Sequence, residues 1–240
     1  MHSPFIFDFI IKVLNDQQQY PSYQFVEDLR RQLLNNHEEI EVKDLGAGSS
    51  MDKTSKRKIS SIAKNAAKSK KYGQLLFRLA KYYQPKTILE LGTSLGVTTA
   101  YLAQGNPKAK VTTMEGSPSI IAEAKKNFAK LALDNIHVVE GNFDETLQET
   151  IGQLSTIDIA FLDGNHRQEP TIRYFNQLKD KLASHSIVVI DDIHWSAGME
   201  QAWQTIKNDS SVKCSVDLFF IGLVFFREEF HEKQHFTIRF

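Results

Sequence analysis

The stretch of residues 87–101 constrains the fold of this chain more than any other part. It passes from an apolar segment, residues 88–91, through a turn with Gly92 and Gly96 at its ends into a run typical of a helix. A buried strand followed by such a turn brings backbone amides and a helix N-terminus against a ligand, because glycine has no side chain to hinder the approach. The stretch therefore predicts a ligand-binding turn, with Glu90 at the end of the strand.

The spacing of the acid and the glycines narrows the kind of ligand. Glu-x-Gly-x-x-x-Gly differs from Gly-x-Gly-x-x-Gly, the pattern of dinucleotide-binding sheets, whose second glycine lets a pyrophosphate lie against the backbone. The stretch resembles instead the first motif of class I S-adenosylmethionine-dependent methyltransferases. The resemblance implies S-adenosylmethionine as cofactor, since a nearby carboxylate suits its sulfonium cation and amino acid group. The cofactor-binding residues expected here are Glu90, Gly92, Thr93, Ser94 and Gly96.

Strand and helix patterns alternate from Tyr72 onward, which predicts an α/β domain with a mainly parallel sheet. Five strands are expected in residues 88–91, 110–114, 136–139, 157–162 and 187–190, and two more in residues 216–226, folded back at Ile221-Gly222. The resemblance implies the same arrangement. We expect a Rossmann-like, doubly wound sheet of seven strands with a terminal antiparallel hairpin, and assign residues 72–240 to the S-adenosylmethionine-binding domain.

The first 71 residues have a different character. Their pattern is helical and polar, without a convincing strand, so residues 1–71 are expected to form an extension of helices and loops, a possible lid or dimer element. The loop of residues 44–50 carries two glycines but is rejected as the cofactor loop, because no buried strand precedes it. The basic run of residues 53–71 is either a solvated loop and helix or a mobile lid over the site. The sequence leaves both open.

Acidic residues end four of the predicted strands: Glu90, Glu115, Asp163 and the pair Asp191-Asp192. Ligands of open α/β sheets bind at the carboxyl ends of the strands. Acids gathered at one edge repel one another unless cations or hydroxyl donors offset their charge, so the pattern favours a site. Glu115 follows Gly92 by about 23 residues, near the interval at which an acid accepts hydrogen bonds from ribose hydroxyls.

The end of the third strand carries Gly141-Asn142-Phe143, where the family resemblance places the adenine. Asn142 would hydrogen-bond the edge of the base and Phe143 would pack on its face. A turn followed by a core aromatic explains the same three residues, and the sequence does not decide between the two.

Two further motifs, Asp163-Gly-Asn-His166 and Asp191-Asp-Ile-His194, resemble the cation-dependent O-methyltransferases of the catechol and caffeoyl-CoA type. In that group the matching positions hold a divalent metal, which implies that Asp163, Asp191 and Asp192 bind Mg²⁺ or another divalent cation. Hard cations prefer such oxygen ligands. Here Asp192 stands where the family has asparagine.

His166 stands where the family has a lysine base. We expect His166, together with Asp163, to be catalytic, because an unperturbed histidine changes charge near neutral pH. Two alternatives stay open. His166 and His194 would favour a transition metal, or the cluster orients substrate and caps helices without any metal.

The composition excludes several other classes. Lysine plus arginine equals aspartate plus glutamate at 29 each, so no global charge attracts nucleic acid or an anionic membrane. The single cysteine, Cys214, excludes a disulfide framework and a cysteine-rich zinc site. The apolar N-terminal run lacks a basic leading segment and contains Asp8, which argues against an export signal. We expect a cytoplasmic protein with a small-molecule acceptor, without nucleic acid or membrane partners, and a possible homodimer.

The sequence therefore predicts an S-adenosylmethionine-dependent methyltransferase that methylates a hydroxyl of a small molecule. A nicotinamide-dependent oxidoreductase, or another nucleotide-binding α/β enzyme, is the alternative, disfavoured by the glycine spacing. Aminopropyl transfer on the same fold and a non-catalytic binding module are further alternatives.

Overall fold

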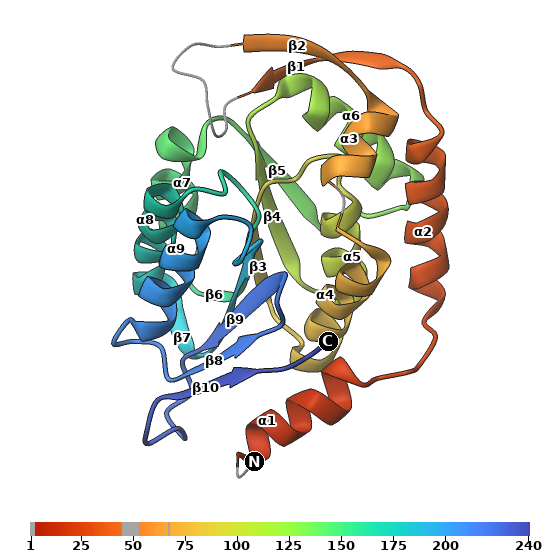
Figure 1. The fold of residues 1–240 in the computed structure, drawn as a ribbon. Coiled ribbons are helices and arrows are strands. Elements are labelled where there is room, and N and C mark those ends of the chain that lie inside the picture. The colour runs from red at the N-terminus through yellow and green to blue at the C-terminus, as the bar shows by residue number, and fades with distance from the viewer. Residues whose placement is uncertain (1–2, 45–52, 67) are drawn as a thin grey trace.

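The computed structural model describes residues 3–44, 53–66 and 68–240. Its centre is an eight-stranded sheet with the strand order β10-β8-β9-β7-β6-β3-β4-β5 (Figure 1). The strands are β3 (Thr87–Leu91), β4 (Lys110–Glu115), β5 (Ile136–Glu140), β6 (Ile157–Leu162), β7 (Leu182–Asp191), β8 (Cys214–Asp217), β9 (Ile221–Phe225) and β10 (Gln234–Thr237). Neighbours in the sheet are parallel except β9, which runs antiparallel to β7 and β8. The predicted Rossmann-like fold with a terminal antiparallel hairpin is confirmed.

Two details of the sheet prediction are wrong. The sheet has eight strands rather than seven, because β10 adds to the edge of β8. This strand is short and largely polar, and it is partly exposed at the edge of the sheet, so it carries no apolar run. The bend expected at Ile221-Gly222 lies earlier, between β8 and β9, where Phe219 takes a left-handed conformation with φ +74°.

Helices cover both faces of the sheet. α4 (Lys70–Tyr83), α5 (Val97–Gly105) and α6 (Pro118–Lys130) lie on one face, and α7 (Phe143–Gly152), α8 (Gln168–Leu178) and α9 (Ala197–Asn208) lie on the other (Figure 1). The short 3₁₀ turn η2 (Lys179–Lys181) follows α8. Ile88 joins the apolar cluster on the α4 side, whereas its neighbour Leu89 joins the cluster of α7–α9. Burial on both faces explains why the parallel strands read as continuous apolar runs.

The N-terminal part contains a hairpin that the sequence did not predict. α1 (Pro4–Phe9), the π-helical turn η1 (Ile10–Leu14) and α2 (Pro21–Leu34) are followed by the antiparallel strands β1 (Glu39–Asp44) and β2 (Lys53–Lys58), then by α3 (Ile59–Ala66). The expectation of helices and loops alone is therefore wrong. Both strands are rich in charge, and opposite charges face each other in the pairs Glu39–Lys58 and Glu41–Lys56, which favours pairing without an apolar run.

These N-terminal elements pack on the main sheet domain. Ile6 and Phe9 are fully buried in a cluster with α4 and with Phe225 of β9. Tyr23 and Val26 of α2 share a third cluster with residues of α3 and α5. Among the described residues, no helix is both long and apolar enough to cross a membrane. The loop rejected as a cofactor site lies outside the described residues beyond Asp44.

The hairpin docks on the start of α6. The backbone amide of Lys43 donates to Ser117 Oγ at 3.2 Å, and Ser119 Oγ donates to the carbonyl of Glu41. Ser117 lies two residues after the end of β4, so the hairpin lies at the carboxyl ends of the strands. The N-terminal elements thus reach the edge where ligands of such sheets bind.

Candidate cofactor and acceptor site

The turn after β3 has no room for side chains at its two glycines. Gly92 has φ +102° and Gly96 has φ +79°, both in the left-handed region that favours glycine. A Cβ at position 92 would collide with the backbone carbonyl of Asp163, and one at position 96 with the ring of Phe128. The amides of Gly92 and Thr93 both donate to the carbonyl of Met114, at 3.0 and 3.1 Å. The turn is therefore held between the ends of β4 and β6.

Glu115 is held in place by backbone amides. The amide of Ser94 donates to its Oε2 at 3.0 Å, and the amides of Gly116 and Ser117 donate to its Oε1 at 2.9 and 3.1 Å. The carboxylate also lines the cavity described next. Its orientation is thus fixed by the chain itself.

A cavity of about 340 Å³ opens at the carboxyl ends of the strands. The predicted site residues that line it are Gly92, Ser94, Glu115, Gly141, Asn142, Phe143, Asp163, His166 and Asp192. Thr93 lines a small crevice beside it. Val42, Lys43, Arg57 and Lys68 of the N-terminal part complete the wall. One cavity therefore brings together the glycine turn, the Glu115 carboxylate and most of the acids at the other strand ends.

Glu90 lies beneath the turn and is absent from the residues that line the cavity. Its side chain is fully buried, and its Oε2 accepts hydrogen bonds from Thr99 Oγ1 at 2.5 Å and Thr113 Oγ1 at 2.6 Å. Its Oε1 has no hydrogen-bond partner among the described residues. Burial outweighs the two hydroxyls and raises the pKa of Glu90 to about 7. The carboxylate therefore joins β3, β4 and α5 behind the turn.

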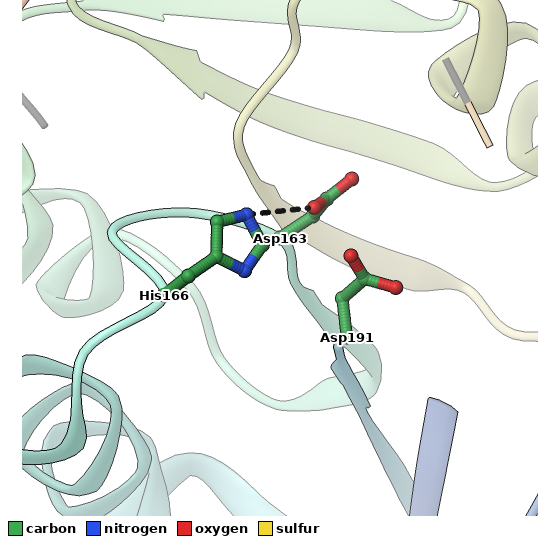
Figure 2. Close-up of side chains that lie close together, drawn as sticks. All are labelled: Asp163, His166 and Asp191. Atoms are coloured by element: carbon green, nitrogen blue, oxygen red, sulfur yellow. Dashed lines mark ion pairs between the residues drawn. The ribbon is translucent and has the colours of Figure 1, made fainter. Parts of the chain in front are cut away.

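The ends of β6 and β7 carry the second group of predicted residues (Figure 2). His166 Nε2 lies 3.5 Å from Asp163 Oδ1, and His166 Nδ1 lies 3.8 Å from Asp192 Oδ2. Asp163, His166 and Asp191 each offer a ligand atom within 4.8 Å of the others. We call Asp163, His166, Asp191 and Asp192 the acidic cluster. The sequence was right to expect that these side chains meet.

A lysine that the sequence did not single out lies against the acidic cluster. The ammonium of Lys68, two residues before α4, contacts Asp191 Oδ2 and lies 3.5 Å from Asp192 Oδ1 and 3.9 Å from Asp163 Oδ1. Burial opposes its charge, but the three carboxylates outweigh burial and raise the pKa of Lys68 above its ordinary value. Lys68 is therefore a firmly charged cation at the centre of the acids.

Burial is the main influence on the pKa values of Asp163 and Asp191 around this lysine. Asp191 is fully buried, and burial raises its pKa although the ammonium of Lys68 opposes the rise. Burial and the negative charge of Asp191 raise the pKa of Asp163 well above its ordinary value. Asp191 Oδ1 has no hydrogen-bond partner within the described ranges. These buried acids therefore need a nearby positive charge to offset their own negative charge.

His194 points away from the acidic cluster. Its Nε2 lies 2.9 Å from Asp217 Oδ2 and its Nδ1 lies 3.1 Å from Glu200 Oε1. Burial lowers the pKa of His194, but Asp217 and then Glu200 outweigh it and raise the pKa overall. This arrangement gives no support to the alternative in which His194 joins His166 on a transition metal.

An aromatic pair forms another part of the cavity lining. Asn142 caps α7 by accepting a hydrogen bond from the amide of Asp144 at 3.1 Å, and Phe143 packs edge-on against Tyr174, with ring centroids 5.9 Å apart. Asn165, which the sequence missed, donates to the hydroxyl of Tyr174 at 3.3 Å. Its Oδ1 is buried and lacks a hydrogen-bond partner in the described structure. Its place in Asp163-Gly-Asn-His166 and its left-handed φ of +65° are the signals that mark it.

Residues 89–193 match the sequence model of a protein family described as "Methyltransferase domain". This part of the chain is similar to methyltransferase domains. Every predicted site residue lies within the matched range. The resemblance to class I S-adenosylmethionine-dependent methyltransferases is confirmed.

Two individual relatives are also methyltransferases. A catechol O-methyltransferase from Mycobacterium tuberculosis is 28% identical over 135 residues, which cover 55% of this chain and 60% of the relative. A second one, from Niastella koreensis, is also 28% identical, over 50% of this chain and 55% of the relative. The chain thus spans little more than half the length of the curated relatives it matches.

Solved structures show the fold. A Podospora anserina methyltransferase, PaMTH1, bound to S-adenosylhomocysteine (SAH), superposes with a TM-score of 0.66 at 16% identity, covering 95% of this chain and 98% of that one. An O-methyltransferase from Bacillus cereus in complex with SAH gives 0.62 at 16% identity, covering 92% and 97%. The fold of the methyltransferase domain therefore extends over nearly the whole chain.

Proposed function

We propose that the protein is an S-adenosylmethionine-dependent methyltransferase that methylates a hydroxyl oxygen of a small molecule. The observation that carries the proposal is the single cavity that joins the glycine turn and Glu115 to Asp163 and His166. The names of the two relatives described above, both catechol O-methyltransferases, support an oxygen acceptor.

The residues around the cavity fit the parts of the cofactor. Glu115 faces the cavity with an orientation fixed by three amides, and it would accept hydrogen bonds from the ribose hydroxyls. The backbone of Gly92 to Ser94 would hold the amino acid part. The buried Oδ1 of Asn165 has no partner among the described residues and belongs to the same cavity lining as Asn142 and Phe143, so it offers an acceptor for the amino group of adenine.

Two of the predicted cofactor contacts take a supporting role in this proposal. Glu90 would hold the turn from behind through Thr99 and Thr113 rather than touch the cofactor, because it is fully buried and does not line the cavity. Gly96 would act through its conformation at the start of α5. When bound, S-adenosylmethionine supplies a methyl group already activated by the sulfonium, so the protein contributes mainly alignment.

His166 is the proposed general base. Its ring lines the cavity, 3.5 Å from Asp163, and a ring nitrogen would take the proton of the acceptor hydroxyl while the oxygen attacks the methyl carbon. Asp163 would orient the ring, as a carboxylate does beside a catalytic histidine.

The predicted divalent cation requires a separate test against the residues present. Asp163, His166 and Asp191 have the donor atoms and the mutual spacing of a metal site. Yet the ammonium of Lys68 contacts Asp191 and lies within 4 Å of Asp163 and Asp192. A second cation beside it would meet strong repulsion at this separation. The arrangement does not fit a metal ion, and we derive no step through one.

Calorimetric titration tests the proposal. We expect the full chain to bind SAH. After incubation with S-adenosylmethionine and catechol, mass spectrometry should show a product in which one hydroxyl hydrogen is replaced by a methyl group. A parallel incubation with decarboxylated S-adenosylmethionine that gave a product carrying an aminopropyl group would assign the chain to aminopropyl transfer instead. Binding of a nicotinamide cofactor without any binding of SAH would contradict the methyltransferase proposal. The cytoplasmic location and the homodimer stay predictions.

A further inference from the structure

Lys68 reaches the acidic cluster from a part of the chain remote in sequence. It stands just before α4, whereas Asp163 follows β6, and Asp191 and Asp192 stand at the end of β7. The ammonium nevertheless lies within 4 Å of a carboxylate oxygen of all three aspartates. Its side chain is only 16% exposed, and it lines the cavity.

The chemistry of the contact makes it more than a surface ion pair. Asp191 has no exposed surface, and a buried carboxylate without a cation is strongly destabilising. A lysine ammonium has three donors, so it can serve Asp191 and Asp192 and still offer a donor to an oxygen in the cavity. It also lies within 4 Å of Asp163 and Asp191, two of the three residues whose donor atoms have the spacing of a metal site.

We propose that Lys68 is the resident cation of the acidic cluster, that it excludes a divalent metal ion, and that its ammonium holds the acceptor oxygen. The last part rests on the proposed methyl transfer, and the first two do not. Lys68 would stabilise the negative charge that develops on the acceptor oxygen as His166 takes the proton. One tethered charge would thus do what a bound divalent ion does at such a site.

Binding of Mn²⁺ tests the exclusion directly, read from the electron paramagnetic resonance signal of the free ion. We expect the wild-type chain, stripped with chelator, to bind Mn²⁺ weakly or not at all. Lys68→Met keeps the apolar stem and removes the charge, and it should tighten Mn²⁺ binding about tenfold or more, as expected when a unit charge within about 4 Å is removed. Lys68→Arg should still exclude the ion. Lys70→Met, an exposed lysine at the start of α4, is the matched control and should behave as wild type.

A double-mutant cycle measured by thermal melting tests the pairing of Lys68 with Asp191 without any metal. Lys68→Met leaves the buried Asp191 unpaired and should lower the melting temperature, and adding Asp191→Asn should restore most of the loss. Additive effects of the two changes would overturn the pairing. Tight Mn²⁺ binding by wild type that Lys68→Met leaves unchanged would overturn the exclusion, as would a Lys68→Met chain that still binds no Mn²⁺. SAH titration of the same samples separates these failures from a failure of the proposed function.

Discussion

The backbone amide of Ser94 donates a hydrogen bond of 3.0 Å to the carboxylate of Glu115, and this bond ties the glycine turn after β3 to the end of β4. Ser94 lies in the turn after β3 and Glu115 ends β4, and both residues line the same cavity. Because the bond forms within the chain alone, the turn and the acid are already arranged before any ligand arrives. Such preorganisation lowers the cost of binding.

Replacing Glu115 should weaken cofactor binding. Glu115→Gln replaces one carboxylate oxygen with an amide NH2 group. This group cannot accept hydrogen bonds from the backbone amides or from a ribose hydroxyl. We expect the affinity for SAH to fall by about 1–3 kcal/mol in calorimetry. Glu140 faces Glu115 across the β4–β5 pair and is exposed, so Glu140→Gln is the matched control and should leave the affinity unchanged. Equal affinities for both variants would contradict the ribose role.

The buried carboxyl of Glu90 should make stability depend on pH. Its pKa is about 7 in the folded chain against an ordinary value of 4.5, so the folded chain binds this proton more tightly than the unfolded chain. The free energy of unfolding should therefore fall as the pH rises from about 4.5 to about 7. Glu90→Gln removes this loss and should be more stable than wild type at about pH 8, by up to roughly 3 kcal/mol, but not at about pH 4.5.

Urea unfolding at the two pH values measures this difference. The glutamine oxygen can still accept from Thr99 and Thr113, so the variant keeps the contacts behind the turn. The exposed Glu140→Gln should show the same difference from wild type at both pH values. A Glu90→Gln variant with the pH dependence of wild type would show that this carboxyl does not titrate as described.

Any side chain at position 92 should be harmful. Ala at a φ of +102° is strained, and its Cβ would collide with the carbonyl of Asp163, so Gly92→Ala should cost at least about 1–3 kcal/mol and weaken SAH binding. Gly152→Ala, at the end of α7, is the matched control and should be neutral or slightly stabilising, because no described atom beyond its own stretch of helix lies within 4 Å of the Cβ position. Thermal melting and calorimetry compare the two, and similar losses would argue against the close approach.

His166 should dominate the rate of methyl transfer. With catechol as the probe acceptor, His166→Gln should lower kcat by about 10²- to 10⁴-fold, the usual contribution of a general base, while SAH binding changes little. His137→Gln, an exposed histidine of β5, should have wild-type kcat. A His166→Gln enzyme with full turnover would remove His166 from the mechanism.

Much of the main domain was predictable because its signals are local. Ile88 and Leu89 are both buried, on opposite faces, and this double burial leaves an apolar run in the sequence. The acids at the strand ends could be expected to meet because parallel strands end at one edge, and Asp163 and Asp191 do so. Their convergence follows from sheet geometry rather than from any contact between neighbours in the chain.

Other features lack a local signal. The strands β1 and β2 depend on charge pairs such as Glu41–Lys56 that appear only when the strands are aligned. Lys68 is one of many lysines in a basic run, and its contact with Asp191 spans 123 residues. No spacing rule distinguishes it from its exposed neighbour Lys70. Such tertiary contacts become visible only in the folded chain.

The wall of the cavity is drawn from two separate stretches of sequence. The glycine turn, Glu115 and Asp163 lie within the matched range of residues 89–193, whereas Val42, Arg57 and Lys68 precede it. Substitutions in the first 70 residues can therefore reshape part of the cavity without altering the residues proposed to hold the cofactor.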